Sequence, residues 1–261
     1  VMATLDQGWW PDGLLTPPSD AAMAHDVVTL KACGFDMVRK HIKVEPLRYY
    51  HLCDKLGMLV LQDMPSSVSD MGPEYDFLEP NIVCRYGLYR MELKGVVDHL
   101  MSVPSTVMWI PCNEGWGQGG RFPTHMTLDW LKRYDPSRLV DGPSGYHDFE
   151  GGQCGVALGQ KLRMTAHLPI GECEAGDVVD FHPYPNPEMP PVNDRRVSFI
   201  GEFGGLGHPV EGHLWKTDAD GNWGYGGIAD TATRLIEDAF EKQNVKDVVG
   251  DAIRYGEICG T

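Results

Sequence analysis

The sequence predicts an α/β protein that folds as a (β/α)8 barrel of the TIM-barrel class, without an evident eighth strand. Short apolar runs alternate along the chain with amphipathic stretches, which indicates parallel strands joined by helical crossovers. Polar residues follow nearly every apolar run, and a closed barrel gathers all such strand ends at one mouth. The length of 261 residues suits a single barrel domain, residues 1–261.

The alternative is an open doubly wound sheet. Such a sheet gathers only the few strand ends beside its switch point. In addition, no strand is followed by a glycine-rich nucleotide motif of the G-x-G-x-x-G or G-x-x-x-x-G-K-[ST] type. The barrel is therefore favoured.

About seven apolar runs qualify as strands, because each is short and bounded by polar or turn residues. In order they are the segment through Leu5 and residues 35–38, 58–61, 107–110, 139–140, 178–181 and 197–200. The run 58–61 is apolar throughout, which is typical of a parallel strand buried on both faces. An eighth strand would be expected to begin near Thr261, and an unclosed barrel would expose strand edges.

Caps and apolar residues at helical spacing predict the helices. Ser19 or Asp20 caps the first helix, and Gly34 suits its end. Pro46 opens the second helix, which Gly57 ends. The remaining helices are expected at residues 82–100, around residues 128–131 and at residues 235–240.

Composition excludes several classes of partner. The 22 basic and 37 acidic residues give a net charge of −15, which repels phosphate backbones and anionic membranes. No apolar run approaches the ~20 residues of a membrane-spanning helix, and no signal peptide is visible. The 10 histidines form no H-x-H or H-E-x-x-H set, which disfavours a metal-dependent hydrolase. We predict no nucleic acid, no membrane, no metal and no other cofactor.

Two glutamates directly follow predicted strands and lie among glycines and aromatic residues, namely Glu114 and Glu202. Breaking a glycosidic bond needs an acid that protonates the leaving oxygen and a carboxylate on the opposite face of the sugar. A retaining enzyme holds the two carboxyl groups ~5–5.5 Å apart, and an inverting enzyme ~6.5–9.5 Å. Two strand ends of one barrel meet this requirement across the mouth, so the pair predicts glycoside hydrolysis.

Six segments lie in order along nearly the whole chain, at residues 6–13, 38–46, 62–65, 104–117, 135–140 and 199–204. Together they resemble glycoside hydrolase family 2, which includes β-galactosidases, β-glucuronidases and β-mannosidases. The segment 104–117, PSTVMWIPCNEGWG, is similar to the acid/base signature of the family, and FIGEFG at 199–204 resembles its nucleophile segment. The resemblance implies that Glu114 is the general acid/base and that Glu202 is the nucleophile.

Seven further residues are predicted to bind the substrate or orient the catalytic groups, because they end strands or lie at the rim of the barrel. They are Arg39, His41, Asp63, Asn113, Trp116, His182 and Tyr184. The resemblance implies that Asn113 binds the sugar 2-hydroxyl. A structural role stays open for each, such as a salt bridge for Arg39 or a rim carboxylate for Asp63.

The resemblance implies a retaining enzyme that acts on a glycoside or oligosaccharide. No basic cluster marks a glucuronate carboxylate, so terminal β-galactosides are slightly favoured. Family members usually carry two further domains before the barrel, neither of which is in this sequence. A carbohydrate-binding barrel without activity, or an inactive fragment of a larger hydrolase, is the alternative. A homo-oligomer and accessory domains stay open as partners.

Overall fold

The computed structural model describes residues 1–66, 80–114, 124–145, 176–184, 192 and 194–205. The chain divides into two compact units, Val1–Phe181 with Pro190–Phe199, and His182–Met189 with Ile200–Thr261. The described helices and strands belong to the first unit, apart from the last residue of the final strand. The single domain expected over residues 1–261 stays a prediction.

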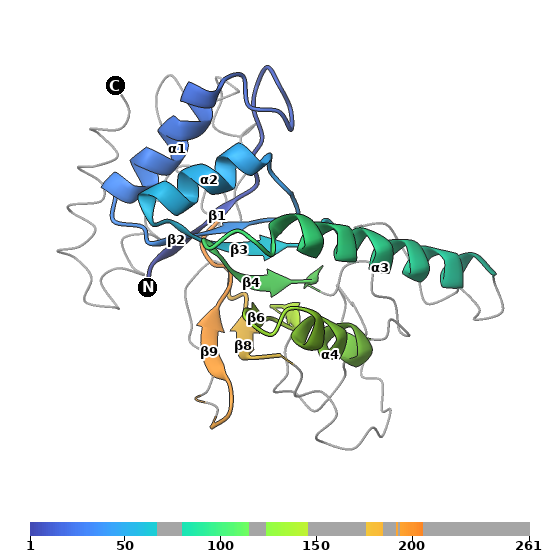
Figure 1. The fold of residues 1–261 in the computed structure, drawn as a ribbon. Coiled ribbons are helices and arrows are strands. Elements are labelled where there is room, and N and C mark those ends of the chain that lie inside the picture. Colours follow the sequence, from blue (N-terminus) through green and yellow to red (C-terminus); the bar gives the residue numbers. More distant parts are fainter. Residues whose placement is uncertain (67–79, 115–123, 146–175, 185–191, 193, 206–261) are drawn as a thin grey trace, which may run out of the picture. The chain divides into compact units, whose positions relative to one another are not determined.

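Parallel strands form the main sheet of the first unit, in the spatial order β1-β2-β3-β4-β6 (Figure 1). Their bounds are Ala3–Asp6, Met37–Lys40, Leu59–Asp63, Thr106–Ile110 and Leu139–Val140. Two smaller pairs are β5 (Cys112–Asn113) with β7 (Pro143–Ser144), and β8 (Val178–Phe181) with β9 (Val197–Ile200). This is the strand arrangement of a barrel wall.

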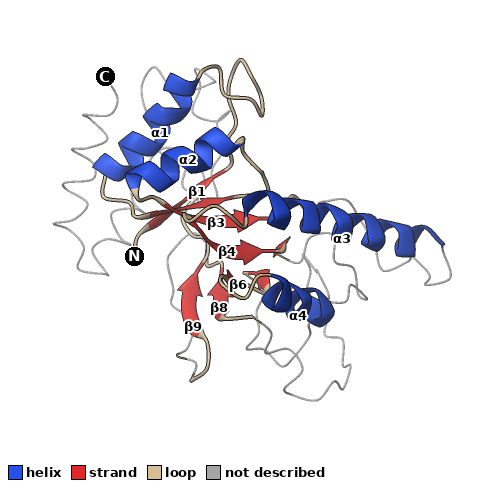
Figure 2. Ribbon diagram, in the orientation of Figure 1, coloured by secondary structure: helices blue, strands red, loops and turns tan. Residues whose placement is uncertain are grey.

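Helices follow the strands in alternation, as the sequence predicts (Figure 2). They are α1 (Asp20–Ala32), α2 (Leu47–Leu56), α3 (Pro80–Leu100) and α4 (Thr124–Tyr134). The expected caps are present, because Ser19 Oγ accepts the backbone N–H of Ala22 over 3.0 Å and Gly57 ends α2 in the left-handed conformation. Across the part of the chain that the structure describes, every helix is too short or too polar to serve as a membrane span.

Two apolar clusters occupy opposite faces of the sheet, because successive residues of a strand point to opposite sides. Val60 and Trp109 pack with residues from α1, α2, α3 and α4 in the first cluster. Leu61, Met108 and Ile110 face the other way and pack with residues of β8 and β9. Burial on both faces explains why these strands read as continuous apolar runs.

β2 and β3 end two residues later than the sequence predicts. The register Arg39 with Leu61 and Lys40 with Gln62 continues the parallel pairing into the polar residues. Those side chains stay in the strands because buried partners satisfy their charges and hydrogen bonds. The predicted helix at residues 235–240 and the expected eighth strand lie outside the described residues.

A buried ion cluster ties the loop after β1 to the chain after β2. Lys40 Nζ lies 2.9 Å from Asp6 Oδ2 and 2.6 Å from Glu45 Oε1. Lys43 Nζ lies 2.8 Å from the same Glu45 oxygen and donates to the Gly8 carbonyl oxygen over 2.7 Å. Because buried charges need partners on every side, the cluster holds the loop at Gly8 in one position.

Gly8→Ala is expected to destabilise the chain more than Gly57→Ala. The φ angles are +65° at Gly8 and +64° at Gly57, so each alanine costs about 1–2 kcal/mol of left-handed strain. A Cβ at Gly8 would also stand 2.6 Å from Glu45 Oε1, whereas one at Gly57 meets nothing within 4 Å. Overpacking adds about 1–3 kcal/mol at Gly8. Urea unfolding of both variants measures the difference, and equal losses would contradict the rigid ion cluster.

Candidate active site

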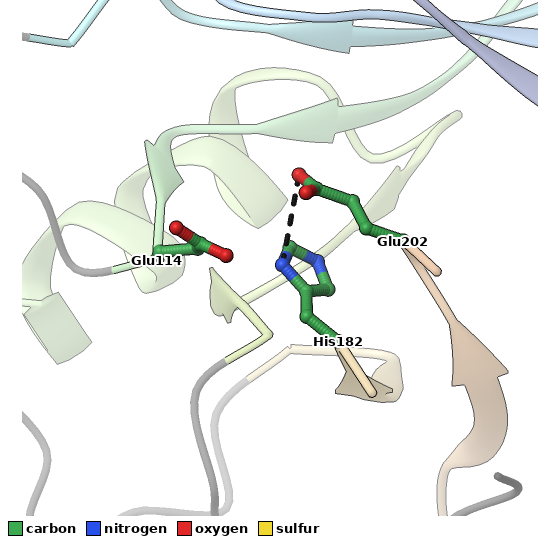
Figure 3. A group of neighbouring side chains, drawn as sticks. All are labelled: Glu114, His182 and Glu202. Carbon is green, nitrogen blue, oxygen red and sulfur yellow. Dashed lines mark ion pairs between the residues drawn. The ribbon is translucent and has the colours of Figure 1, made fainter. Parts of the chain in front are cut away.

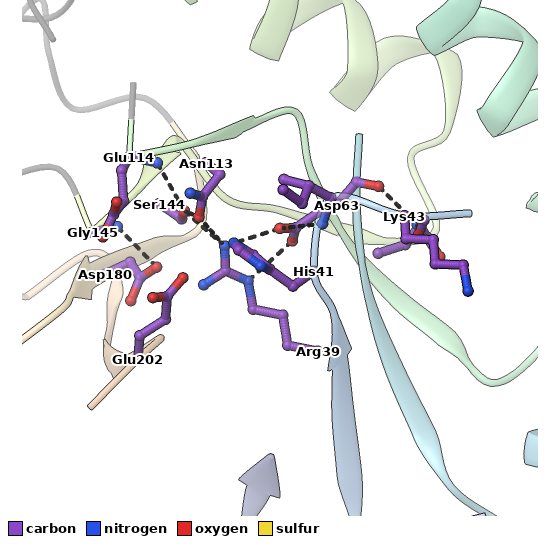
Figure 4. A network of polar contacts seen from close by, with 12 residues as sticks. Arg39, His41, Lys43, Asp63, Asn113, Glu114, Ser144, Gly145, Asp180 and Glu202 are labelled. Carbon is purple, nitrogen blue, oxygen red and sulfur yellow. Dashed lines mark hydrogen bonds and ion pairs between the residues drawn. The ribbon is translucent and has the colours of Figure 1, made fainter. Parts of the chain in front are cut away.

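A buried polar network lies at the carboxyl ends of β2 and β3 and beside β5 and β7, and Arg39 is its centre (Figure 4). The guanidinium donates to Asp63 twice, from Nε to Oδ1 over 3.0 Å and from Nη2 to Oδ2 over 3.1 Å. Nη2 also donates to Asn113 Oδ1 over 2.8 Å and to Ser144 Oγ over 2.9 Å. One side chain therefore links four strands of the first unit.

Both carboxylate oxygens of Asp63 accept hydrogen bonds within this network. Asp63 is fully buried, its two oxygens accept from Arg39, and Oδ2 also accepts the backbone N–H of Ile42 over 3.1 Å. Burial raises the pKa of Asp63 above its ordinary value, because the loss of water outweighs the Arg39 charge and the hydrogen bonds. The geometry favours the structural role for Asp63, and its binding to sugar hydroxyls stays a prediction.

The amide of Asn113 has a fixed orientation. Its Oδ1 accepts from Arg39 Nη2 over 2.8 Å and from the Ser144 hydroxyl over 3.2 Å. With the oxygen turned to these two donors, the NH₂ group is directed away from them. The orientation of the Asn113 amide is therefore fixed by Arg39 and Ser144, and its binding to the sugar 2-hydroxyl stays a prediction.

Backbone strain marks two residues of this region. Glu114 and Ile42 adopt φ angles of +48° and +43°, in the left-handed region that side-chain-bearing residues rarely occupy. The backbone N–H of Glu114 is held by the carbonyl oxygen of Ser144 over 3.0 Å and by its Oγ over 3.3 Å. Strain of this kind collects at functional sites, where surrounding contacts over-determine the conformation.

The second unit holds Glu202 with two of the predicted residues. The Tyr184 hydroxyl donates to Glu202 Oε2 over 2.6 Å, and His182 Nδ1 lies 3.6 Å from Oε1. The side chains of His182 and Glu202 point towards each other (Figure 3). The hydrogen bond from the Tyr184 hydroxyl fixes the direction of the Glu202 carboxylate, as a nucleophile requires.

His41 and Trp116 complete the set of predicted residues. His41 is buried, and its Nδ1 lies 3.2 Å from Gln7 Nε2, in the loop that follows β1. Trp116 lies outside the described residues. The substrate-binding roles of both stay predictions.

The sequence reasoning missed Ser144. It contacts Arg39, Asn113 and the backbone of Glu114, and it is fully buried. The signal was present, because Ser144 lies in a polar segment that directly follows the strand at 139–140. The rule that singled out Glu114, a polar residue after a strand, applies equally to Ser144.

The family follows from the sequence together with this fold. Residues 19–150, half of the chain, match the family model for glycosyl hydrolases family 2, TIM barrel domain. The chain belongs to glycoside hydrolase family 2. The matched segment contains Arg39, Asp63, Asn113, Glu114 and Ser144. The predicted TIM-barrel class and the family resemblance are both confirmed.

Relatives in the family are named as β-galactosidases. One from Enterobacter cloacae is 26% identical over 237 residues, which cover 80% of this chain and 22% of that protein. One from Alteromonas mediterranea is 30% identical over 128 residues, which cover 48% of this chain and 12% of that protein. The chain thus spans about a fifth of the length of the Enterobacter relative, or less for the Alteromonas one.

A solved structure of the family supports the fold. The family 2 β-galacturonidase from Eisenbergiella tayi, bound to glycerol, superposes with a TM-score of 0.52 at 18% identity. The match covers 70% of this chain and 28% of that one. At this identity the likeness concerns the barrel fold.

Proposed function

We propose that this chain is the catalytic barrel of a retaining β-glycosidase that removes terminal β-linked sugars by double displacement. Glu114 serves as general acid/base and Glu202 as nucleophile. The observation that carries the proposal is the buried network around Asn113 and Glu114. The network fixes the orientation of the Asn113 amide and the strained backbone of Glu114, and both residues lie within the segment that matches the family.

In the first step Glu202 attacks the anomeric carbon while Glu114 protonates the leaving oxygen, which gives a covalent glycosyl-enzyme. In the second step Glu114 takes a proton from water, which then hydrolyses the intermediate with retention of configuration. The NH₂ group of Asn113 donates to the sugar 2-hydroxyl, a bond that strengthens in the transition state. Tyr184 keeps the Glu202 carboxylate directed until attack.

A β-galactoside is the substrate that we favour. The curated relatives compared above carry the name β-galactosidase, whereas the solved structure is named a β-galacturonidase. The first unit offers Arg39, Lys40 and Lys43 near the strand ends, and carboxylates already pair with each of them. Because carboxylates of this chain already pair with these three side chains, none of the three is well placed to bind the carboxylate of a uronic acid substrate.

A panel of nitrophenyl β-glycosides tests the proposal. Hydrolysis of one sugar with a β-configured first product supports the retaining mechanism and identifies the substrate. A folded chain that binds sugars without turnover supports the alternative of a carbohydrate-binding barrel or inactive fragment. An α-configured first product, read by proton NMR, would exclude retention.

Tyr184→Phe is expected to lower kcat by about 10- to 100-fold, because it removes a hydrogen bond to a carboxylate. The bond is the 2.6 Å contact with Glu202 Oε2. Tyr134→Phe is the matched control, since the hydroxyl of Tyr134 contacts exposed Asp98 on α3. Steady-state kinetics on the responsive glycoside measure both variants. Equal kcat values for Tyr184→Phe and the wild type would contradict the role of Tyr184.

A further inference from the structure

Two buried carboxyl groups meet beside the Arg39 network. Asp141 follows β6 directly and Asp180 lies in β8, and they are 1% and 4% exposed. The two side chains are within hydrogen-bonding contact of each other. Asp141 Oδ2 is buried and accepts no hydrogen bond from any other described group. Two ionised carboxylates cannot hydrogen-bond each other, so the contact requires a proton on one of them.

The charges around Asp141 agree with a retained proton. Burial raises the pKa of Asp141 well above its ordinary value, and the Asp180 charge raises it further. Arg39 on β2 and the backbone N–H of Gly142 act in the opposite direction. Arg39 also holds Asp63 through two hydrogen bonds, so its single charge is shared between that carboxylate and the pair.

The pair is connected to the candidate active site through the turn after β7. Asp180 Oδ2 accepts the backbone N–H of Gly145 over 3.1 Å (Figure 4). Gly145 has a φ of +62°, which sets the chain direction immediately after Ser144. Ser144 in turn bonds Asn113 Oδ1 and the backbone N–H of Glu114. The path from Asp180 to Glu114 therefore consists of hydrogen bonds and one peptide link.

We propose that the hydrogen-bonded carboxyl pair Asp141–Asp180 is a positioning element, which holds the turn after β7 and thereby orients Asn113 and Glu114. Asp141 donates its proton to Asp180, and Asp180 accepts from the turn. The role in catalysis rests on the proposed glycosidase function. When the proton leaves to solvent above the raised pKa of Asp141, two like charges remain in buried contact and push the turn out of position.

Asp141→Asn tests the proton directly, because an amide keeps the shape and the donor without a charge. The folded wild type holds a proton that the unfolded chain releases above the ordinary carboxyl pKa of 3.8. Stability of the wild type therefore falls as pH rises from that value towards the raised pKa, by up to about tenfold in the unfolding constant per pH unit. Asp141→Asn should lack this slope, whereas exposed Asp129→Asn on α4 should keep it.

A second readout follows the backbone amide of Glu114 and needs no turnover. In the wild type alone it tests whether the position of Glu114 responds to pH. The backbone amide resonance of Glu114 should shift with pH as Asp141 titrates, and the shift should be absent in Asp141→Asn. Identical stability slopes in the wild type and Asp141→Asn would overturn the shared proton. A chemical shift of the Glu114 amide that stays constant while Asp141 titrates would overturn the positioning role.

The kinetic arm separates this inference from the proposed function. On a responsive nitrophenyl glycoside, kcat of the wild type should decline as pH rises through the raised pKa of Asp141, and Asp141→Asn should keep its kcat to higher pH with KM little changed. A decline with rising pH that is the same in both proteins would overturn the positioning role. If the wild type has no turnover on any sugar, the proposed function fails, while the stability slope and the Glu114 titration still decide whether the pair holds the turn.

Discussion

Glu202→Ala is expected to lose nearly all glycosidase activity, on the order of 10⁴-fold or more in kcat, because no covalent intermediate can form without the nucleophile. Substrate binding should change far less, since the variant removes a group that acts mainly in the transition state. The measurement is kcat and KM on the responsive nitrophenyl glycoside. Circular dichroism and thermal unfolding establish that the variant is folded.

Glu114→Ala provides the comparison within the same chain. It should lose about 10²- to 10⁴-fold on alkyl glycosides, but less on nitrophenyl glycosides, whose leaving groups need little protonation. Glu92→Ala, an exposed position on α3, is the control and should retain full activity. If the dependence on leaving group appeared with Glu202→Ala in place of Glu114→Ala, the two assigned roles would have to be exchanged.

Arg39→Met is expected to lower the free energy of unfolding by about 3–5 kcal/mol, because it leaves the Asp63 carboxylate buried without a counterion. Asn113 and Ser144 lose a donor at the same time. The deficit should shrink as pH falls, since burial already raises the pKa of Asp63 and the variant raises it further. A protonated Asp63 is neutral and tolerates burial better.

The matched control is Arg48→Met. Arg48 pairs with Asp20 over 2.6 Å, but the two side chains are 50% and 78% exposed. Its loss should cost less than about 1 kcal/mol. Urea unfolding at neutral and acidic pH compares the variants, and a similar small loss for Arg39→Met would show that the buried network carries little stability.

Much of the fold could be predicted because its signals are local. The Ser19 cap and the left-handed Gly57 depend on neighbours in the sequence and are found where they were expected. The apolar run at 58–61 likewise predicted β3, although the strand continues to Asp63. The strands β5 and β7 were missed, since two residues carry no periodicity. They exist because Asn113 and Ser144 pair across 31 positions of the chain.

The site was predictable to the extent that catalytic groups follow strands. Asn113 and Arg39 were singled out on that ground, and the structure joins them through one hydrogen bond. The contact between Arg39 and Ser144 spans 105 positions, so no local pattern indicates it. The shared proton of Asp141 and Asp180 depends on burial and on distance between side chains, neither of which a single sequence states.

The left-handed backbone at Ile42 and Glu114 has a consequence for evolution and engineering of this barrel. Each strained residue costs of order 1–3 kcal/mol, which glycine would largely recover. Selection for thermostability alone would therefore replace these two residues with glycine early, whereas selection for turnover would preserve them. At position 114 the left-handed backbone favours glycine, whereas the proposed chemistry needs a glutamate. The chain therefore gives up some stability at this position for the sake of activity.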